Sequence, residues 1–202
     1  MRVYVETNFV LEVARKQEQS AACEALMALA EREKARLVIP AYCLIEPYEA
    51  STRTLRERRA LLREIERQRN ELVRSLDYGK KARSVLGEAL TFLARTELEE
   101  ERRLRALIQK INAVAEVIPL SNAVVDGGLW AQREGFGPQD AIVYASILEH
   151  LSGEHQSDCV FLNRNSKDFG SPEVVTRLGQ NRCKLLFDFE HGIRYVRSKL
   201  SS

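Results

Sequence analysis

Short apolar runs rich in β-branched residues recur along this chain, and stretches of helical pattern separate them. The first run is Val3-Tyr4-Val5, which is too short for a helix and is typical of a buried strand. Strands that alternate with helices at short spacing favour a parallel sheet flanked by helices. The alternation therefore predicts an α/β fold built on a mainly parallel sheet.

The pattern also places the individual elements. Strands are expected at 2–5, 36–39, 115–119, 159–162 and 184–187. Helices are expected at about 8–16, 18–34, 121–134 and 138–152, with one more after the last strand. Pro47 is tolerable in a helix only in the first turn, where its missing N–H breaks no bond. Glu46 is therefore expected near the start of a helix that opens around Cys43.

Residues 50–113 have a helical pattern almost throughout. Apolar residues recur at heptad-like spacing, and Asp77-Tyr78-Gly79 interrupts them, which predicts an antiparallel pair of long helices. No linker rich in Pro, Gly or Ser flanks the region, so residues 1–202 are predicted to form one domain with 51–113 as a helical hairpin insertion. The insertion has 16 Lys and Arg against 10 Asp and Glu. This charge suits contact with a polyanion such as RNA, and it equally suits a solvated helical face.

Composition narrows the class of protein. No run of about 18 apolar residues occurs, which excludes a membrane-spanning helix. The chain enters its first strand without an apolar leader, so a cytoplasmic location is expected. The four cysteines have no Cys-x-x-Cys spacing and are expected to be reduced core thiols. His150, His155 and His191 have no metal-ligand spacing and are expected at the surface.

Acidic and amide side chains occur where predicted strands end or where the following helices begin. The set is Glu6, Glu46, Asp140, Asn165 and Asp168. Ligands of open α/β sheets bind beyond the carboxyl ends of the strands, so these groups are expected to converge. Oxygen ligands suit Mg²⁺ or Mn²⁺, whereas carboxylates crowded together without a metal repel one another. Each residue alone has a simpler explanation as a cap, a favourable charge at a helix start or a turn residue.

Four segments, in this order, resemble the motifs of PIN-domain nucleases. The segment Glu6-Thr7-Asn8 is similar to the Asp-Thr-Asn motif that opens the domain, with Glu in place of Asp. The segment from Ile39 to Glu46 is similar to the second strand and the helix that carries the family's Glu. The segment from Pro138 to Ser146 resembles the one that carries the third acidic residue. The segment from Phe161 to Phe169 is similar to a strand and turn that end in Asp-Phe.

The resemblance covers about 1–50 and 115–190, and it implies a three-layer α/β/α sandwich. It also implies a metal-dependent endoribonuclease that hydrolyses RNA phosphodiester bonds with Mg²⁺ or Mn²⁺. Glu6, Glu46 and Asp140 are implied as catalytic metal ligands, with Asn165 or Asp168 as the fourth group. Thr7 and Asn8 are implied to organise the first turn or to contact a phosphate or metal-bound water. The residues expected at the RNA are Thr7, Asn8, Asn163, Arg164, Arg56, Arg59 and Arg63.

Alternatives stay open at this point. Glu6 is longer than the family's Asp and Asn165 is neutral, so a catalytically degenerate module that binds RNA or protein is one alternative. A toxin blocked by an antitoxin-like protein is another, and the hairpin is a candidate homodimer interface. Trp130, Phe136 and Tyr144 are expected to be packing residues in each case.

Overall fold

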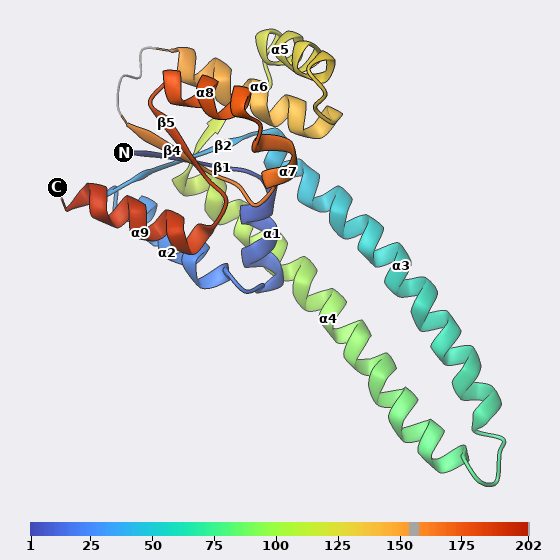
Figure 1. Cartoon of the computed structure of the whole chain (residues 1–202). Helices are drawn as coiled ribbons and strands as arrows, with labels where there is room; N and C mark the ends of the chain where they lie inside the picture. Colours follow the sequence, from blue (N-terminus) through green and yellow to red (C-terminus); the bar gives the residue numbers. More distant parts are fainter. Residues whose placement is uncertain (154–157, 202) are drawn as a thin grey trace.

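In the computed structural model, which describes residues 1–153 and 158–201, the chain forms a five-stranded, all-parallel sheet with strand order β3-β2-β1-β4-β5 (Figure 1). The strands are β1 (Arg2–Val5), β2 (Arg36–Pro40), β3 (Glu116–Ile118), β4 (Cys159–Leu162) and β5 (Cys183–Leu186). Each one lies within one residue of its predicted bounds. The predicted α/β fold class is confirmed.

The middle strand β1 is buried on both faces of the sheet. Val3, Tyr4 and Val5 are at most 1% exposed, and the register places Val3 beside Leu37 of β2 and Val160 of β4. A strand covered on both sides has no polar face to alternate with its apolar one. This is why the strands appear in the sequence as continuous apolar runs.

Helices on the two faces of the sheet come from different parts of the chain (Figure 1). One layer contains α1 (Thr7–Arg15), α2 (Ser20–Glu31) and α9 (Phe189–Leu200). The other layer contains α5 (Asn122–Arg133), α6 (Pro138–Ser152) and α8 (Pro172–Gln180), with the short α7 (Ser166–Phe169) after β4. The strand order reverses between β1 and β4, and ligands of open α/β sheets bind at such a switch point. Residues that follow β1 and β4 therefore occupy the position where a site is expected.

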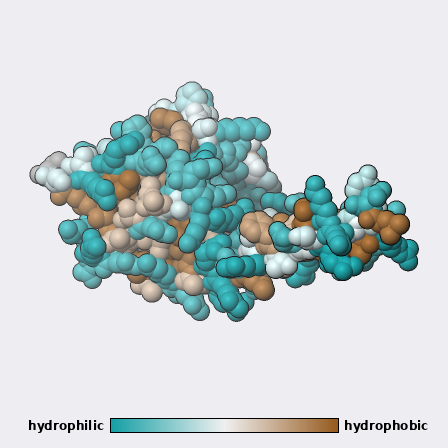
Figure 2. Space-filling view, turned by 90° about the horizontal axis from the view of Figure 1, so that it is seen from below, coloured by the Kyte–Doolittle hydropathy of each residue, from teal (hydrophilic) through white to brown (hydrophobic). Residues whose placement is uncertain are grey.

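The segment that connects β2 to β3 in the sequence forms a helical hairpin, which projects from the body of the domain (Figures 1 and 2). It consists of α3 (Tyr42–Leu72) and α4 (Gly79–Val114), so the predicted break and the antiparallel pair are confirmed. With 31 and 36 residues, the helices extend for about 46 and 54 Å. The base of α4 packs into the body, where Ile111 is fully buried. Further out, Leu76 and Phe92 are exposed, and Figure 2 shows hydrophobic residues among the hydrophilic ones on this projection.

Pro47 lies deeper in its helix than expected. The helix α3 begins at Tyr42, which makes Pro47 its sixth residue and places it in the second turn. The prediction of a first-turn proline is therefore wrong, and the cost is that Pro47 has no N–H to donate to the Cys43 carbonyl. Glu46 is nevertheless the fifth residue of the helix, close to its start as expected.

His150 was expected at the surface, and this is also wrong. Its Nδ1 lies 2.8 Å from the Tyr4 hydroxyl and its Nε2 lies 3.1 Å from Glu116, on a side of α6 that faces the sheet. His191 is exposed as expected, while His155 lies outside the described residues. The pattern on α6 is apolar nearly all round, so it does not distinguish a buried histidine with polar partners from an exposed one.

All four cysteines are free and buried, as predicted. Among the helices of the described segments, none combines the length and the apolar character that a membrane crossing requires.

Candidate active site

The structure brings the four acidic residues of the predicted site together at the carboxyl end of the sheet. Glu6 follows β1 directly, Glu46 is the fifth residue of α3, Asp140 lies in the first turn of α6, and Asp168 lies on α7 after β4. Electrostatic repulsion acts between Glu6 and both Glu46 and Asp140, and between Asp140 and Asp168. The cluster therefore lies beside the switch point of the sheet and is held together against its own charge.

Glu6 is 7% exposed, and its two carboxylate oxygens have different surroundings. One oxygen, Oε2, accepts a hydrogen bond of 3.0 Å from the backbone N–H of Asn8 and so caps α1. The other, Oε1, is buried without a hydrogen-bond partner in the described chain. Burial raises the pKa of Glu6 to about 8, the bonds from Asn8 oppose this, and Glu46 and Asp140 add to it. Glu6 therefore caps the helix with one oxygen and leaves the other without a partner in the described chain.

Thr7 positions Glu46 from the first turn of α1. Its hydroxyl donates a hydrogen bond to Glu46 Oε2, and Thr7 itself is buried. Burial raises the pKa of Glu46, the bond from Thr7 opposes this, repulsion by Glu49 adds to it, and the charge of Arg53 opposes it. The contact joins the end of β1 to the start of α3 across 39 residues of sequence.

Asp140 owes its place to the turn that precedes α6. Gly135 has a φ of 99°, a left-handed conformation that glycine adopts without strain, and Pro138 then opens the helix. Asp140 falls in the first turn, where the helix dipole favours a negative charge. Burial raises its pKa, and repulsion by Asp168 and then Glu46 raises it further.

Asn165 bridges two carboxylates. Its Nδ2 donates to Asp168 Oδ2 at 2.5 Å and to Asp140 Oδ1 at 3.4 Å. Its Oδ1 accepts the backbone N–H of Asp168 at 3.3 Å and so caps α7. In this arrangement the amide nitrogen faces the acidic cluster, and the amide oxygen is used within its own turn.

Two residues expected at the RNA, Asn163 and Arg164, have contacts within the chain. Asn163 is fully buried, and its Oδ1 accepts the backbone N–H of Asn165 at 2.5 Å. Arg164 forms an ion pair with Glu12, which is 1% exposed, and lies 3.5 Å from Glu18. Asn163 thus shapes the loop that carries Asn165, and Arg164 neutralises a buried carboxylate on α1.

The arginines of α3 differ in their partners. Arg59 forms an ion pair of 3.2 Å with Glu97 of α4. Arg56 and Arg63 are exposed and form no ion pair within the described chain. The charge of Arg53 acts on Glu46, which makes Arg53 the nearest to the cluster of these four.

Two polar residues beside the acidic cluster, Tyr42 and Gln139, were not singled out from the sequence. Tyr42 lies beside Gln139 and interacts with Glu46; burial raises the pKa of its phenol, Glu46 raises it further, and a hydrogen bond with Gln139 lowers it. Tyr42 stands one helical turn before Glu46, and Gln139 immediately precedes Asp140. These two spacings are the signals in the sequence from which Tyr42 and Gln139 could have been predicted.

The residues fit a divalent cation in donor type and charge, but not yet in position. Carboxylate oxygens are the ligands that Mg²⁺ and Mn²⁺ prefer, and the partnerless Glu6 Oε1 is a buried acceptor in need of a cation or donor. Within residues 1–153 and 158–201, no group of three or more Asp, Glu, His or Cys side chains is arranged to hold an ion. The carboxylates of Glu6 and Glu46, each held by one hydrogen bond, would therefore have to shift before an ion could be shared.

One comparison with known proteins identifies the family of the chain. No curated protein matches the chain. One similar solved structure is the crystal structure of VapBC2 from Rickettsia felis bound to a DNA fragment from their promoter, with 12% identity, a TM-score of 0.45, and coverage of 92% of this chain and 98% of that one. A family model described as a PIN domain matches residues 3–169, which include all four acidic residues and the hairpin. The chain belongs to the PIN-domain family.

Proposed function

We propose that this protein is a metal-dependent endoribonuclease whose active site is formed by Glu6, Glu46, Asp140 and Asp168. The observation that supports it best is that these carboxylates lie close enough to repel one another, while one of them, Glu6, has a buried oxygen without a partner in the described chain. A buried polar oxygen without a partner is costly, and a bound cation would supply the partner that the described chain does not provide. PIN domains are generally nucleases, so family membership supports the same activity.

The metal in this proposal is Mg²⁺ or Mn²⁺, held by Glu6, Glu46 and Asp140. Such an ion activates water for attack on phosphorus and stabilises the negative charge that develops on the phosphate. The chain supplies the fixed positions: Thr7 holds one oxygen of Glu46, and the Asn8 backbone holds one oxygen of Glu6. The other oxygen of Glu6 has no hydrogen-bond partner in the described chain and is the acceptor that a cation would satisfy.

The fourth acidic position is assigned to Asp168 in preference to Asn165. The oxygen of the Asn165 amide is used by the Asp168 backbone, while its nitrogen donates to Asp168 and Asp140. A hydrogen-bond donor cannot bind a cation, so Asn165 acts as a positioning residue. It donates to both carboxylates, more closely to Asp168 than to Asp140, and reduces their repulsion.

RNA is proposed to follow the exposed side of α3 away from the acidic cluster. This helix begins at the site, and Arg53, Arg56 and Arg63 supply positive charge along it without a described ion pair. Phosphate contacts of this kind supply affinity with little sequence preference.

Arg56→Gln and Arg63→Gln are each expected to weaken RNA binding and to make it less sensitive to salt. Each phosphate contact on a single strand contributes about 0.7 to the slope of log affinity against log salt, so each variant should lower that slope by about this amount. The measurement is fluorescence anisotropy of a labelled single-stranded RNA across a salt series. Arg59→Gln is the matched control, since Glu97 already neutralises Arg59. Equal slopes in the wild type and all three variants would place the RNA elsewhere.

The proposed activity is tested by incubating a mixed pool of labelled RNAs with the protein in Mn²⁺, in Mg²⁺ or in EDTA. Cleavage with at least one of the two metals and none in EDTA is expected. Calorimetric titration of the protein with Mn²⁺ gives a second readout that needs no RNA. Metal binding and RNA binding without cleavage would instead support the degenerate binding module.

The partners expected from the sequence, a second copy of the chain and an antitoxin-like protein, remain predictions. The exposed apolar residues of the hairpin are compatible with either, and no contact within the described chain distinguishes them.

A further inference from the structure

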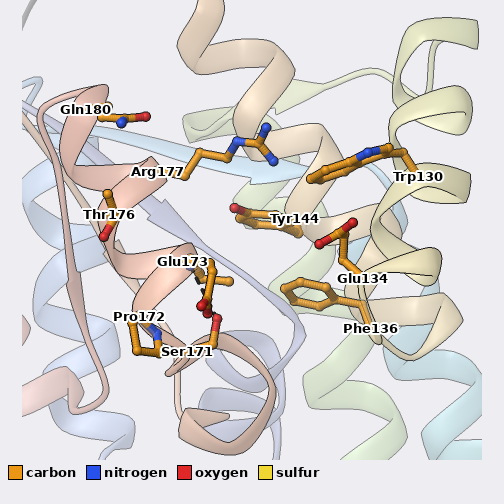
Figure 3. A pocket seen from close by; sticks show the side chains of 11 residues that line it. Trp130, Glu134, Phe136, Tyr144, Ser171, Pro172, Glu173, Thr176, Arg177 and Gln180 are labelled. Atoms are coloured by element: carbon orange, nitrogen blue, oxygen red, sulfur yellow. Dashed lines mark hydrogen bonds between the residues drawn. The ribbon is translucent and has the colours of Figure 1, made fainter.

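A cavity of about 700 Å³ opens between α5, α6 and α8, on the face of the sheet that carries Asp140 (Figure 3). Trp130 was expected in the core, but it is 42% exposed and forms one wall of this cavity. The guanidinium of Arg177 lies 4.4 Å from the Trp130 ring centre and reaches across from α8. The side chains on which the argument depends are Trp130, Glu134, Phe136, Tyr144, Glu173 and Arg177.

The floor of the cavity is a rigid aromatic stack. The rings of Phe136 and Tyr144 lie 4.8 Å apart at an interplanar angle of 14°. Phe169 packs edge-on against both, with centroid distances of 5.6 and 6.3 Å. Phe169 is fully buried in the core, so the stack is anchored to the sheet and presents a fixed surface.

The same elements join this floor to the acidic site. Tyr144 follows Asp140 by four residues on α6, so the two lie on one side of the helix and about 6 Å apart along its axis. Phe169 immediately follows Asp168. A strand of RNA held at the carboxylates would therefore pass the mouth of the cavity within a nucleotide or two.

The charges of the cavity favour a base over a phosphate. Glu134 and Glu173 line it against the single guanidinium of Arg177, and Figure 3 shows Glu134 between the Trp130 and Phe136 rings. Carboxylates repel phosphate but accept hydrogen bonds from the amino groups of nucleobases. Aromatic rings and guanidinium planes are the surfaces on which proteins stack unpaired bases.

We propose that this cavity binds one nucleobase of the RNA strand that occupies the acidic site, and so contributes to the choice of the cleaved bond. The inference rests on the proposed ribonuclease function. The contacting pair of Trp130 and Arg177 supplies the stacking surface on its exposed side, and Glu134 and Glu173 accept the base's N–H groups. Bases with an exocyclic amino group are therefore preferred over uracil.

Trp130 is the one tryptophan of the chain, so its fluorescence reports directly on the cavity. The experiment titrates the protein, in EDTA, with a short oligoadenylate, the matching oligouridylate and the same ribose–phosphate chain without bases. Saturable quenching by the oligoadenylate, weaker quenching by the oligouridylate and none by the abasic chain are expected. An equal response to the abasic chain would show that phosphate acts on Trp130 and would overturn the proposal, as would no response to any of the three.

Two exposed positions supply the matched variants. Arg177→Gln is expected to weaken the fluorescence response about tenfold, which corresponds to the loss of one stacking contact. Leu129→Ala changes an exposed neighbour on α5 outside the cavity and should respond like the wild type. An unchanged response in Arg177→Gln would contradict the assignment of the guanidinium to the base.

Cleavage kinetics separate this inference from the proposed function. Trp130→Ala is expected to raise KM about tenfold and to leave kcat unchanged, because it removes binding rather than chemistry. If base-dependent quenching occurs but no metal supports cleavage, the cavity assignment stands and the ribonuclease proposal fails. If metal-dependent cleavage occurs without base-dependent quenching, the ribonuclease stands and the cavity assignment fails.

Discussion

Replacing Asp140 with Asn is expected to lower RNA cleavage by more than about 100-fold while the protein stays folded. Loss of an outer partner of a metal site already costs about 10- to 100-fold in activity or affinity, so loss of a direct carboxylate ligand should exceed that range. Asn keeps the shape and the oxygen that accepts the bond from Asn165. The substitution removes one negative charge from a cluster whose other acidic members are Glu6, Glu46 and Asp168.

Stability provides the internal check on this result. Burial and repulsion by Asp168 and Glu46 raise the pKa of Asp140, so the folded state disfavours its charged form. Asp140→Asn should therefore melt at the same temperature as the wild type or higher, in the absence of divalent ions. Loss of cleavage together with a lowered melting temperature would point to damage of the fold instead of the site.

The matched control is Asp126→Asn, which changes an exposed aspartate on α5. It should retain full cleavage and Mn²⁺ affinity, whereas Asp140→Asn should weaken Mn²⁺ binding in calorimetry as well as cleavage. Full cleavage by Asp140→Asn would remove this residue from the active site and with it the common site of the four carboxylates.

Much of the fold could be predicted because each strand is a short apolar run that helices cover on both faces. The local pattern of apolar residues is enough to predict such strands. The break between the two long helices, just before Gly79, could be predicted from local sequence in the same way. Pro47 was misplaced because a sequence rule about proline does not include the packing that sustains α3 beyond it. The rule gives the cost of one lost backbone hydrogen bond, and the long hairpin tolerates that cost.

The acidic residues of the site could be predicted because chain order and strand ends place them at one edge. Their partners could not, since Thr7 reaches Glu46 across 39 residues and Arg164 reaches Glu12 across 152. Arg164 shows why the partners are hard to predict. It lies next to Asn165 in the sequence, but its side chain turns toward α1, because the buried carboxylate of Glu12 needs a cation. Such pairings depend on the three-dimensional arrangement and leave no periodic signal.

Trp130 was misjudged for a related reason. Its helix packs on α6 through small residues: Gly128 is buried and Ala131 is fully buried. An aromatic residue between them in sequence looks like core, but at 100° per residue it projects from a different side of the helix. The face that α5 buries carries Val124, Gly128 and Ala131, which leaves the largest side chain of the helix at the mouth of a cavity.

Replacing Glu6 with Gln is expected to stabilise the protein at high pH when divalent ions are removed. The pKa of Glu6 is about 8 in the folded state against an ordinary value of 4.5. Between these pH values the folded protein holds a proton that the unfolded chain has released, so the free energy of unfolding falls as pH rises. Below about 4.5 both states are protonated and the penalty is absent, while above about 8 it is complete.

The size of this penalty makes it measurable. A shift of this extent corresponds to on the order of 5 kcal/mol, and Gln removes this penalty because it carries no charge in either state. Its side-chain oxygen can still accept the bond from Asn8, so the cap of α1 is kept. Urea unfolding of both proteins in EDTA, at a series of pH values, should give curves that coincide near pH 4.5 and separate toward pH 9.

Divalent ions should reverse the order of stability of the wild type and Glu6→Gln at high pH. A cation that binds the ionised Glu6 stabilises the folded wild type by mass action, whereas the neutral Gln binds it more weakly. Adding Mn²⁺ at high pH is therefore expected to raise the stability of the wild type and to narrow or invert its difference from Glu6→Gln. If the difference between the two proteins did not change with pH in EDTA, Glu6 would not be the buried, repelled carboxylate described here. If it changed with pH but not with Mn²⁺, the carboxylate would be strained without serving as a metal ligand, and the degenerate binding module would become the better explanation.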